Sequence, residues 1–252
     1  MMLFLLLSVL NSQAFTLIST GNVGWQTSTL TFNVDTTCNN YLGAVNAAMN
    51  SAISLWTNAP TANLTLAIGS TVTFSGTLSQ YVGTSATLVA PAGNPTIICS
   101  TTFSTDTGIA ANSGIPGVAG AFNISSGRIQ GGLLVLNVQS GDNANITTMN
   151  STVVAVIVAH EMGHILGLGH SGDTSALMYY DASAKNVLSL GQDDVDGISF
   201  LYPRQEPRDK VFGCATIENI NSGSGGGTSL PLLFEFVLLL TIIRLGIRNA
   251  KT

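Results

Sequence analysis

Charged residues are scarce in this sequence. Asp, Glu, Lys and Arg make up 8% of its 252 residues, whereas roughly 25% is usual in a globular domain. The 8 Lys and Arg residues against 13 Asp and Glu leave no basic surface for phosphates, which excludes a nucleic-acid binder. A hydrophobic content of 45% also excludes charge-driven disorder.

Cysteine and histidine are also scarce, with three of each. Cys38 and Cys99 lie in the part of the chain that is predicted to fold, and we predict that they form a disulfide. In the chain-entropy picture, closing a loop of that size stabilises the fold by roughly 4 kcal/mol. Cys214 is then the unpaired cysteine of an odd set.

The N-terminus begins with an apolar run, MMLFLLLSVL, followed by small residues at Ser12–Ala14. This pattern predicts a secretory signal peptide over residues 1–14, with cleavage near Ala14. The alternative is a buried first strand. A signal peptide predicts a protein that is secreted or displayed on the cell surface.

The C-terminus combines three different compositions. A Gly/Ser-rich linker is predicted over 204–229, and a hydrophobic segment with basic residues at its end covers 230–252. This order resembles the tripartite sorting tails of Gram-negative surface proteins, of the GlyGly-CTERM kind. A glycosylphosphatidylinositol signal and a membrane-anchoring helix are the alternatives. Each of the three predicts attachment to a membrane or cell surface at some stage, with the body outside the cytoplasm.

The body, residues 15–203, is predicted to be one domain of mixed strands and helices. Ser28–Val34 alternates and is rich in β-formers. From Leu42 an apolar stripe at helical spacing predicts a helix that Asn39 or Asn40 would cap. Further strands are expected at Leu64–Ala67, Thr71–Phe74, Thr96–Cys99, Gly117–Phe122 and Gly131–Val138, with a loop over Ser104–Pro116.

A second helix is predicted from about Thr152 to Leu166, although its first part, VVAVIV, has strand propensity. Propensity is a weak indicator that tertiary context overrides. An all-apolar segment also fits a helix that is buried on every side, and Asn150 or Ser151 can cap it. The arrangement of histidines at its end decides for the helix.

All three histidines fall within the sequence HEMGHILGLGH, residues 160–170. On a helix, His160 and His164 are four residues apart and project from one face, so both imidazoles can reach one zinc ion. Gly167 can adopt positive φ, which would end the helix and bring His170 to the metal as a third ligand. Three neutral nitrogens leave a fourth position for water, as in a catalytic zinc site. Three buried core histidines would be a costly alternative without a metal or partners.

The segment resembles the H-E-x-x-H-x-x-G-x-x-H motif of the metzincins. Downstream, ALMY at residues 176–179 and QDDVDGISFLY at residues 192–202 look like the matrixin branch of that family. GVAGAF at residues 117–122 is similar to the matrixin edge strand that lines the substrate cleft. The resemblance covers most of Trp25–Tyr202 and is densest after Asn150.

By this resemblance the fold is α+β: a twisted, mostly parallel five-stranded sheet packed on two long helices, with a short C-terminal helix. The activity implied is that of a zinc endopeptidase, with protein or peptide substrates and one catalytic Zn²⁺ held by His160, His164 and His170. Met178 would form the Met-turn beneath the histidines. The residues expected to hold the substrate as an added strand are Val118, Ala119, Gly120 and Ala121.

Two positions depart from the matrixin pattern. Gly120 stands where matrixins place a histidine for a second, structural zinc, so one zinc is expected here. Tyr180 follows Met178 by two residues, where matrixins usually have proline. Since astacins and serralysins have a tyrosine there, Tyr180 is a candidate transition-state stabiliser; the alternative is an ordinary tyrosine of the pocket wall.

The predicted chemistry is hydrolysis of a peptide bond. Zinc would activate a water molecule, with Glu161 first as general base and then as general acid. Substrate preference would come from the segment Tyr179–Leu190. Asp193, Asp194 and Asp196 could bind Ca²⁺, although acids at this spacing are more often capping or solvated residues. A catalytically inert zinc-containing binding module and an adhesin are the alternative functions.

Overall fold

The computed structural model describes residues 15–19, 21, 24–78, 92–122, 127–182 and 185–204. All of them belong to the first of two compact units, Met1–Glu206. The predicted signal peptide, linker, C-terminal segment and Cys214 lie outside the described residues. Within the ranges described, no helix combines the length and apolar character that crossing a bilayer requires.

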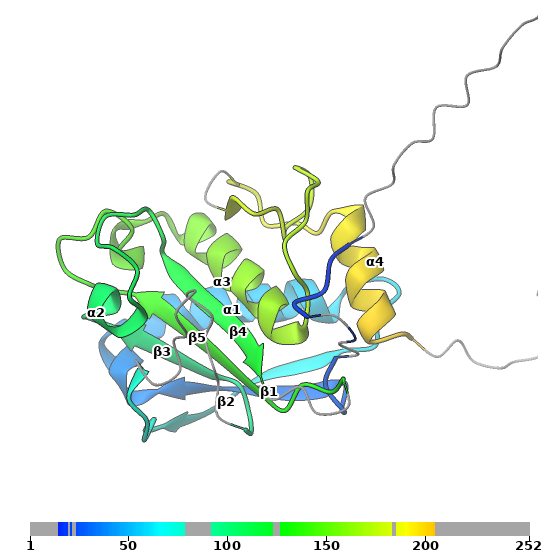
Figure 1. The fold of residues 1–252 in the computed structure, drawn as a ribbon, viewed down its shortest axis with the longest axis horizontal. Helices are drawn as coiled ribbons and strands as arrows, with labels where there is room; N and C mark the ends of the chain where they lie inside the picture. Colours follow the sequence, from blue (N-terminus) through cyan, green and yellow to red (C-terminus); the bar gives the residue numbers. More distant parts are fainter. Residues whose placement is uncertain are drawn as a thin grey trace, which may run out of the picture. The chain divides into compact units, whose positions relative to one another are not determined.

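The fold is built on one five-stranded sheet with strand order β2-β1-β3-β5-β4 (Figure 1). The strands are β1 (Thr29–Asp35), β2 (Thr65–Val72), β3 (Thr96–Ser100), β4 (Gly117–Phe122) and β5 (Gly131–Asn137). All neighbours are parallel except β4 and β5, which pair antiparallel. The expected mostly parallel sheet is therefore confirmed, with β4 at its edge.

Side chains of the central strands point alternately to the two faces of the sheet, and each face has its own hydrophobic cluster. Ile97 of β3 and Leu134 and Leu136 of β5 contribute to the main core, whereas Ile98, Leu133 and Val135 belong to a smaller cluster. Successive side chains of a strand point to opposite faces. All seven residues of β5 are consequently buried.

Two long helices pack against each other in the main core, α1 (Leu42–Thr57) and α3 (Ser151–Leu166). A shorter helix, α4 (Gln192–Leu201), closes the described part of the chain. The stripe predicted for the first helix supplies the buried residues Val45, Met49, Ala52 and Trp56. The prediction of helix from Thr152 to Leu166 is confirmed to within one residue.

Three local predictions were wrong. Neither Asn39 nor Asn40 caps α1: both lie within the 3₁₀ helix η1 (Thr36–Tyr41), and the α1 N-cap, Tyr41, makes no side-chain capping bond. The segment expected to be a loop from Ser104 contains the short helix α2 (Phe103–Thr107), because Phe103 covers the smaller cluster of the sheet.

The third error concerns β2, which is one strand where two short runs were expected. It continues through Gly69, where a Cβ atom would lie 2.3 Å from Asn33 Oδ1 and 2.6 Å from Thr31 Cγ2. Glycine therefore lets β2 stay paired with β1 beside a register shift between Phe32 and Val34.

A disulfide between Cys38 and Cys99 ties η1 to β3. Both cysteines are fully buried, and the bond joins residues 61 positions apart. In the unfolded chain it restricts the whole segment between them, which includes α1 and β2.

Candidate metal centre

Helix α3 is capped at both ends, by a side chain at its start and by a glycine at its end. At its start, the Asn150 side chain accepts a hydrogen bond from the Thr152 backbone N–H, which satisfies one orphan donor of the first turn. At its end, Gly167 adopts φ 111°, and its N–H donates to the carbonyls of Gly163 and His164. A left-handed glycine is the residue type best suited to this turn.

The last carbonyls of α3 find partners far away in the sequence. The indole Nε1–H of Trp25 donates to the Ile165 carbonyl at 2.8 Å, and the hydroxyl of Tyr202 donates to the Leu166 carbonyl at 2.7 Å. Buried helix ends need such partners because their carbonyls have none within the helix. Both ends of the described domain thus fix the end of the helix that bears two histidines.

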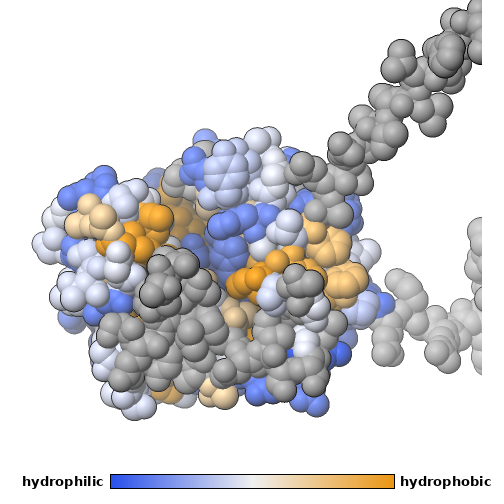
Figure 2. Space-filling view, in the orientation of Figure 1, coloured by the Kyte–Doolittle hydropathy of each residue, from blue (hydrophilic) through white to orange (hydrophobic). Residues whose placement is uncertain are grey.

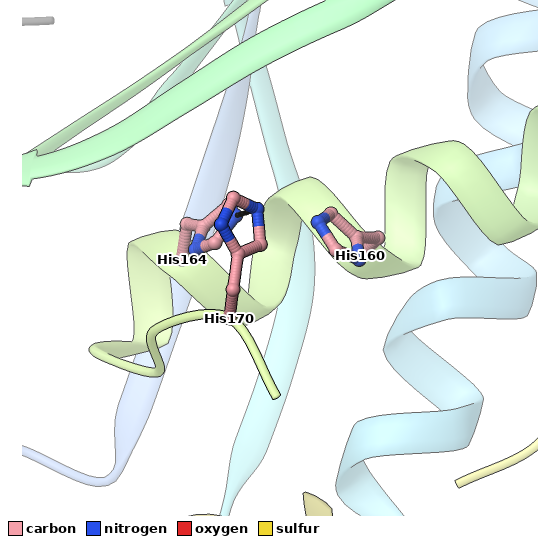
Figure 3. Close-up of side chains that lie close together, drawn as sticks. All are labelled: His160, His164 and His170. Atoms are coloured by element: carbon pink, nitrogen blue, oxygen red, sulfur yellow. Dashed lines mark hydrogen bonds between the residues drawn. The ribbon is translucent and has the colours of Figure 1, made fainter. Parts of the chain in front are cut away.

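Three histidines converge at this end of α3 (Figure 3). His160 and His164 project from the helix, and His170 reaches the same point from the loop that follows. Their ring nitrogens offer one ligand atom each within 4.8 Å of one another. Among the described residues, no other group of three or more His, Cys, Asp or Glu side chains is placed to hold a metal ion.

Backbone carbonyls orient two of the rings. His160 Nδ1 lies 2.8 Å from the Leu177 carbonyl oxygen, and His164 Nδ1 lies 2.9 Å from that of Leu168. A carbonyl can only accept, so each Nδ1 carries the proton and each Nε2 keeps its lone pair. Such second partners fix the tautomer and the ring orientation of metal-binding histidines.

The histidine arrangement fits a bound cation. His164 Nε2 and His170 Nε2 face each other at 3.2 Å, and two lone pairs at this distance repel unless a proton or a metal ion lies with them. Burial lowers the pKa of His160 to about 4 and that of His164 to about 3. It also lowers the pKa of His170. The imidazoles are therefore neutral at pH 7, which is the form that binds a metal.

Glu161 stands beside this cluster. Desolvation by burial raises the pKa of its carboxyl to about 8, and a hydrogen bond from the Ala119 backbone opposes that increase. Ala119 belongs to β4, so the edge strand and the histidine helix meet at this carboxyl group. The Cβ of an alanine at Gly117 would lie 3.8 Å from Glu161 Cγ, which shows how closely β4 runs past the helix.

These groups line one cavity of about 510 Å³. On one side lie Gly117, Val118 and Ala119 of β4, with Ser113–Pro116 before them. Tyr180, Asp181 and Ala182 line the cavity as well. Figure 2 shows this face of the molecule, with a hydrophilic hollow between two hydrophobic patches.

Met178, the predicted Met-turn residue, packs against α3 beside the histidine cluster. It is 2% exposed, and its Sδ atom would lie 2.3 Å from a Cβ added at Gly163, one residue before His164. The Ser171 N–H donates to the Met178 carbonyl at 2.7 Å, which closes the loop between His170 and Met178.

Asp194 is a structural residue of the site that sequence patterns alone did not assign. Its carboxylate accepts hydrogen bonds from the N–H groups of Leu177, Met178 and Gly191. It thereby fixes the turn whose Leu177 carbonyl orients His160. The signal in the sequence was an acid in the first turn of the last helix, where carboxylates cap backbone N–H groups.

Tyr180 lines the cavity and is 65% exposed. Its ring lies 4.3 Å from that of Tyr179, centroid to centroid. Of the predicted edge-strand residues, Val118 and Ala119 line the cavity, whereas Gly120 and Ala121 are buried further along β4.

Part of the domain is similar to known proteins. Residues 99–203 match the family model for matrixin. An interstitial collagenase of Oryctolagus cuniculus is 48% identical over 56 residues, which is 22% of this chain and 12% of that protein. The chain therefore contains a matrixin-like region over residues 99–203.

Two further relatives show the same limited extent of similarity. Matrix metalloproteinase-20 of Homo sapiens is 49% identical over 80 residues, 30% of this chain and 16% of the relative. Metalloendoproteinase 1 of Glycine max is 41% identical over 66 residues, 26% and 22% of the two chains. The matched part therefore spans under a quarter of each of these three relatives. The matrixin family uses a catalytic zinc ion, and the three histidines of this matrixin-like domain could bind it.

Proposed function

We propose that this chain is an exported zinc-dependent endopeptidase that hydrolyses peptide bonds in proteins. The observation that carries the proposal is that three neutral imidazoles and one carboxyl group share a cavity bordered by the edge strand of the described sheet. A structural zinc site would be closed by a fourth protein ligand. Among the described residues only these three ligands converge.

The zinc ion would be held by His160, His164 and His170. When bound, it supplies Lewis acidity and brings the pKa of a coordinated water close to 7. The chain's own contribution begins with the two carbonyls that keep the His160 and His164 rings in the productive tautomer. Met178 and Gly163 support the cluster from below by packing.

Glu161 would move the proton. A zinc ion at the neighbouring histidines would favour the ionised form of its carboxyl group. The carboxylate would then accept a proton from the attacking water and later return it to the amine of the leaving peptide. The hydrogen bond from Ala119 holds the carboxylate between the histidines and the edge strand, the place where a scissile bond lying along β4 would pass.

The substrate would bind as an extended strand along β4. Among the described strands, β4 ends the sheet and pairs with β5 alone. Its other backbone edge would bond to a peptide, a mode known as β-augmentation. Within the segment Val118, Ala119, Gly120 and Ala121, the backbone groups that do not face β5 would provide these bonds. The segment Tyr179–Leu190, of which Tyr180, Asp181 and Ala182 line the cavity, would select the side chain next to the cleaved bond.

Tyr180 is proposed to stabilise the transition state. Its side chain lines the cavity and is exposed enough to reorient, and a phenol can donate a hydrogen bond to a developing oxyanion. A Tyr180→Phe variant should then lose at least about tenfold in kcat with little change in KM. Unchanged turnover would leave Tyr180 as a wall residue.

The compositions of the two terminal segments support a proposal about export and processing. We propose that residues 1–14 are removed as a signal peptide, and that 230–252 directs the protein to the cell surface through the linker 204–229. Mass spectrometry of the mature protein recovered from cells and medium would identify both ends. An intact N-terminus beginning at Met1 would contradict the signal peptide.

The test of the main proposal is cleavage of a denatured protein by the full chain. Cleavage should stop with a zinc chelator and return with added zinc. A Glu161→Gln variant should retain zinc and lose about 10²–10⁴-fold in turnover. Stoichiometric zinc without cleavage would instead support the inert binding module, and chelator-insensitive cleavage would contradict the mechanism.

A further inference from the structure

The N-terminal strap, residues 15–19, pairs with the loop that carries His170. The Ile18 N–H donates to the Gly167 carbonyl at 3.0 Å, and the Gly169 N–H donates to the Thr16 carbonyl at 2.9 Å. Leu17 and Leu168 form an antiparallel bridge between them. The strap and the loop are about 150 residues apart in the sequence, so this pairing is a long-range one.

Thr16 adds a contact with the ligand residue itself. Its hydroxyl donates a short hydrogen bond, 2.5 Å, to the backbone carbonyl of His170. Of the three histidines, His170 alone stands outside the helix, and it is exposed. The position of His170 therefore depends on the loop 167–170. The same loop supplies the Leu168 carbonyl, which accepts a hydrogen bond from His164 Nδ1.

Close packing anchors the strap on the last helix. The rings of Phe15 and Phe200 lie 5.4 Å apart. A Cβ at Gly197 would lie 2.7 Å from Leu168 Cδ2 and 3.1 Å from Phe15 Cβ. In Figure 1 the dark-blue start of the described chain runs beside α4. Gly197 thus leaves space for the strap and the loop on the same helix.

Gly169 shows how little room separates the strap from the loop. A Cβ at this position would lie 2.5 Å from Thr16 Oγ1 and 2.9 Å from the Leu17 carbonyl oxygen. Its φ is not in the left-handed region, so the need for glycine here comes from the approach of the strap and not from the turn.

We propose that the N-terminal strap is a positioning element of the metal centre, with Thr16 as the residue that holds His170 in place for zinc. The inference rests on the proposed function. The strap fixes the one ligand that the helix cannot fix. Without it, the loop would still bear His170, but the imidazole would spend part of its time away from the other two.

The first test is the zinc dissociation constant of the full chain, measured by competition with a chromogenic chelator. Thr16→Val, which keeps the shape and removes the hydroxyl, should bind zinc about tenfold more weakly, at the low end of the 10–100-fold range for outer-shell partners. Thr16→Ser should restore most of the affinity. Thr65→Val, the same exchange at an exposed position of β2, should bind zinc like the wild type.

The second test is Gly169→Ala, which should displace the strap and weaken zinc binding by up to about 100-fold. Amide hydrogen exchange supplies a readout that does not depend on activity, since the Ile18 and Gly169 N–H groups should lose protection together. The melting temperature of each metal-free variant separates loss of fold from loss of ligand positioning.

The outcomes separate this inference from the proposed function. If the wild-type chain binds no zinc, both are overturned. If it binds zinc and Thr16→Val and Gly169→Ala bind it equally tightly, only the strap inference is overturned. A lower melting temperature with unchanged zinc affinity would likewise make the strap a purely structural element.

Discussion

Helices α1 and α3 have the same length, 16 residues, and pack against each other, but they differ in what keeps them helical. In α1, buried and exposed residues alternate at helical spacing, and Ala is frequent. In α3, nearly every residue from Val154 onward is buried, and the first half is rich in β-branched residues. Helix α1 follows from its own sequence, whereas α3 is stabilised by its surroundings.

The comparison also separates structure from chemistry. Helix α1 carries no charged side chain, and the candidate site takes none of its residues. Helix α3 carries two of the three candidate metal ligands, with the half-buried carboxyl group of Glu161 between them in the sequence. Because buried polar groups need a fixed partner, α3 depends on contacts from α1, β4, the Met-turn and the N-terminal segment. The predictions below test this dependence.

The contact between the two helices should give the largest effect on stability. Trp56 is fully buried, and its indole N–H donates to the Ala159 carbonyl of α3 at 2.9 Å. Trp56→Ala should lower the free energy of unfolding by about 3–5 kcal/mol through the cavity and the lost bond, as measured by denaturant titration. Ser54→Ala, on the exposed side of α1, should change it by about 0.5 kcal/mol or less. Equal effects would contradict the assigned faces of α1.

The titratable groups of α3 should make the metal-free protein most stable near pH 6.5. The pKa values of His160 and His164 are lowered to about 4 and about 3, so stability is lost as pH falls below their unfolded value of about 6.5. The pKa of Glu161 is raised to about 8, so stability is also lost as pH rises from its unfolded value toward 8. Between about pH 4.5 and 6.5 the two imidazoles change the free energy of unfolding more than the one carboxyl group does, so stability rises with pH in this range.

Each uncompensated proton corresponds to roughly 1.4 kcal/mol per pH unit. Thermal unfolding in the presence of chelator from pH 4.5 to 8 would measure this optimum. Glu161→Gln should remove the decrease above pH 6.5 and leave the decrease below it. A wild-type stability that keeps rising between pH 6.5 and 8 would disprove the burial of Glu161.

Two glycines give a matched pair between the helices. Gly163→Ala in α3 would place a Cβ 2.3 Å from Met178 Sδ and 3.0 Å from Trp56 Cζ2, and should cost about 1–3 kcal/mol by overpacking. Gly43→Ala in α1 meets nothing within 4 Å and should stabilise the protein by a few tenths to about 1 kcal/mol. Thermal unfolding would measure both changes in stability. If Gly163→Ala left the stability unchanged, the Met178 side chain would move aside without cost.

Capping should give the smallest of the destabilising effects. Asn150→Ala removes the side-chain acceptor for the Thr152 N–H and should cost α3 about 1 kcal/mol. Asn40→Ala should change stability by about 0.5 kcal/mol or less, because α1 has no side-chain cap. If Asn40→Ala lost more stability than Asn150→Ala, the predicted Asn40 cap of α1 would be supported and the observed Asn150 cap of α3 would be contradicted.

Much of the fold was predictable because its signals are local. The stripe from Leu42 to Trp56 and the glycine after Leu166 marked the ends and buried faces of both helices. Strands β4 and β5 each followed from an apolar run in the sequence. Helix α2 and the continuity of β2 were missed because each depends on a contact with another element, Phe103 with the sheet and Gly69 with β1.

Some residues of the candidate site were likewise predictable from the sequence, and others depend on contacts between distant segments. The resemblance of residues 160–170 and 176–179 to matrixin motifs is enough to name the three histidines and Met178. Asp194 was noted as an acid, but its three backbone partners belong to the turn and the loop before α4. Nothing in the segment Phe15–Ser19 marked it as a partner of the His170 loop, since backbone pairing leaves little trace in side-chain identity.

The sequence by itself determined which residues can hold a metal ion. A helix places residues four apart on one face, and a glycine that ends the helix turns the next histidine toward them. Only the tertiary structure decided that the His160 and His164 rings present Nε2, because the carbonyls that bind their Nδ1 atoms come from the chain beyond the helix. It also decided what holds His170, since hydrogen bonds between distant segments depend on how the whole chain packs.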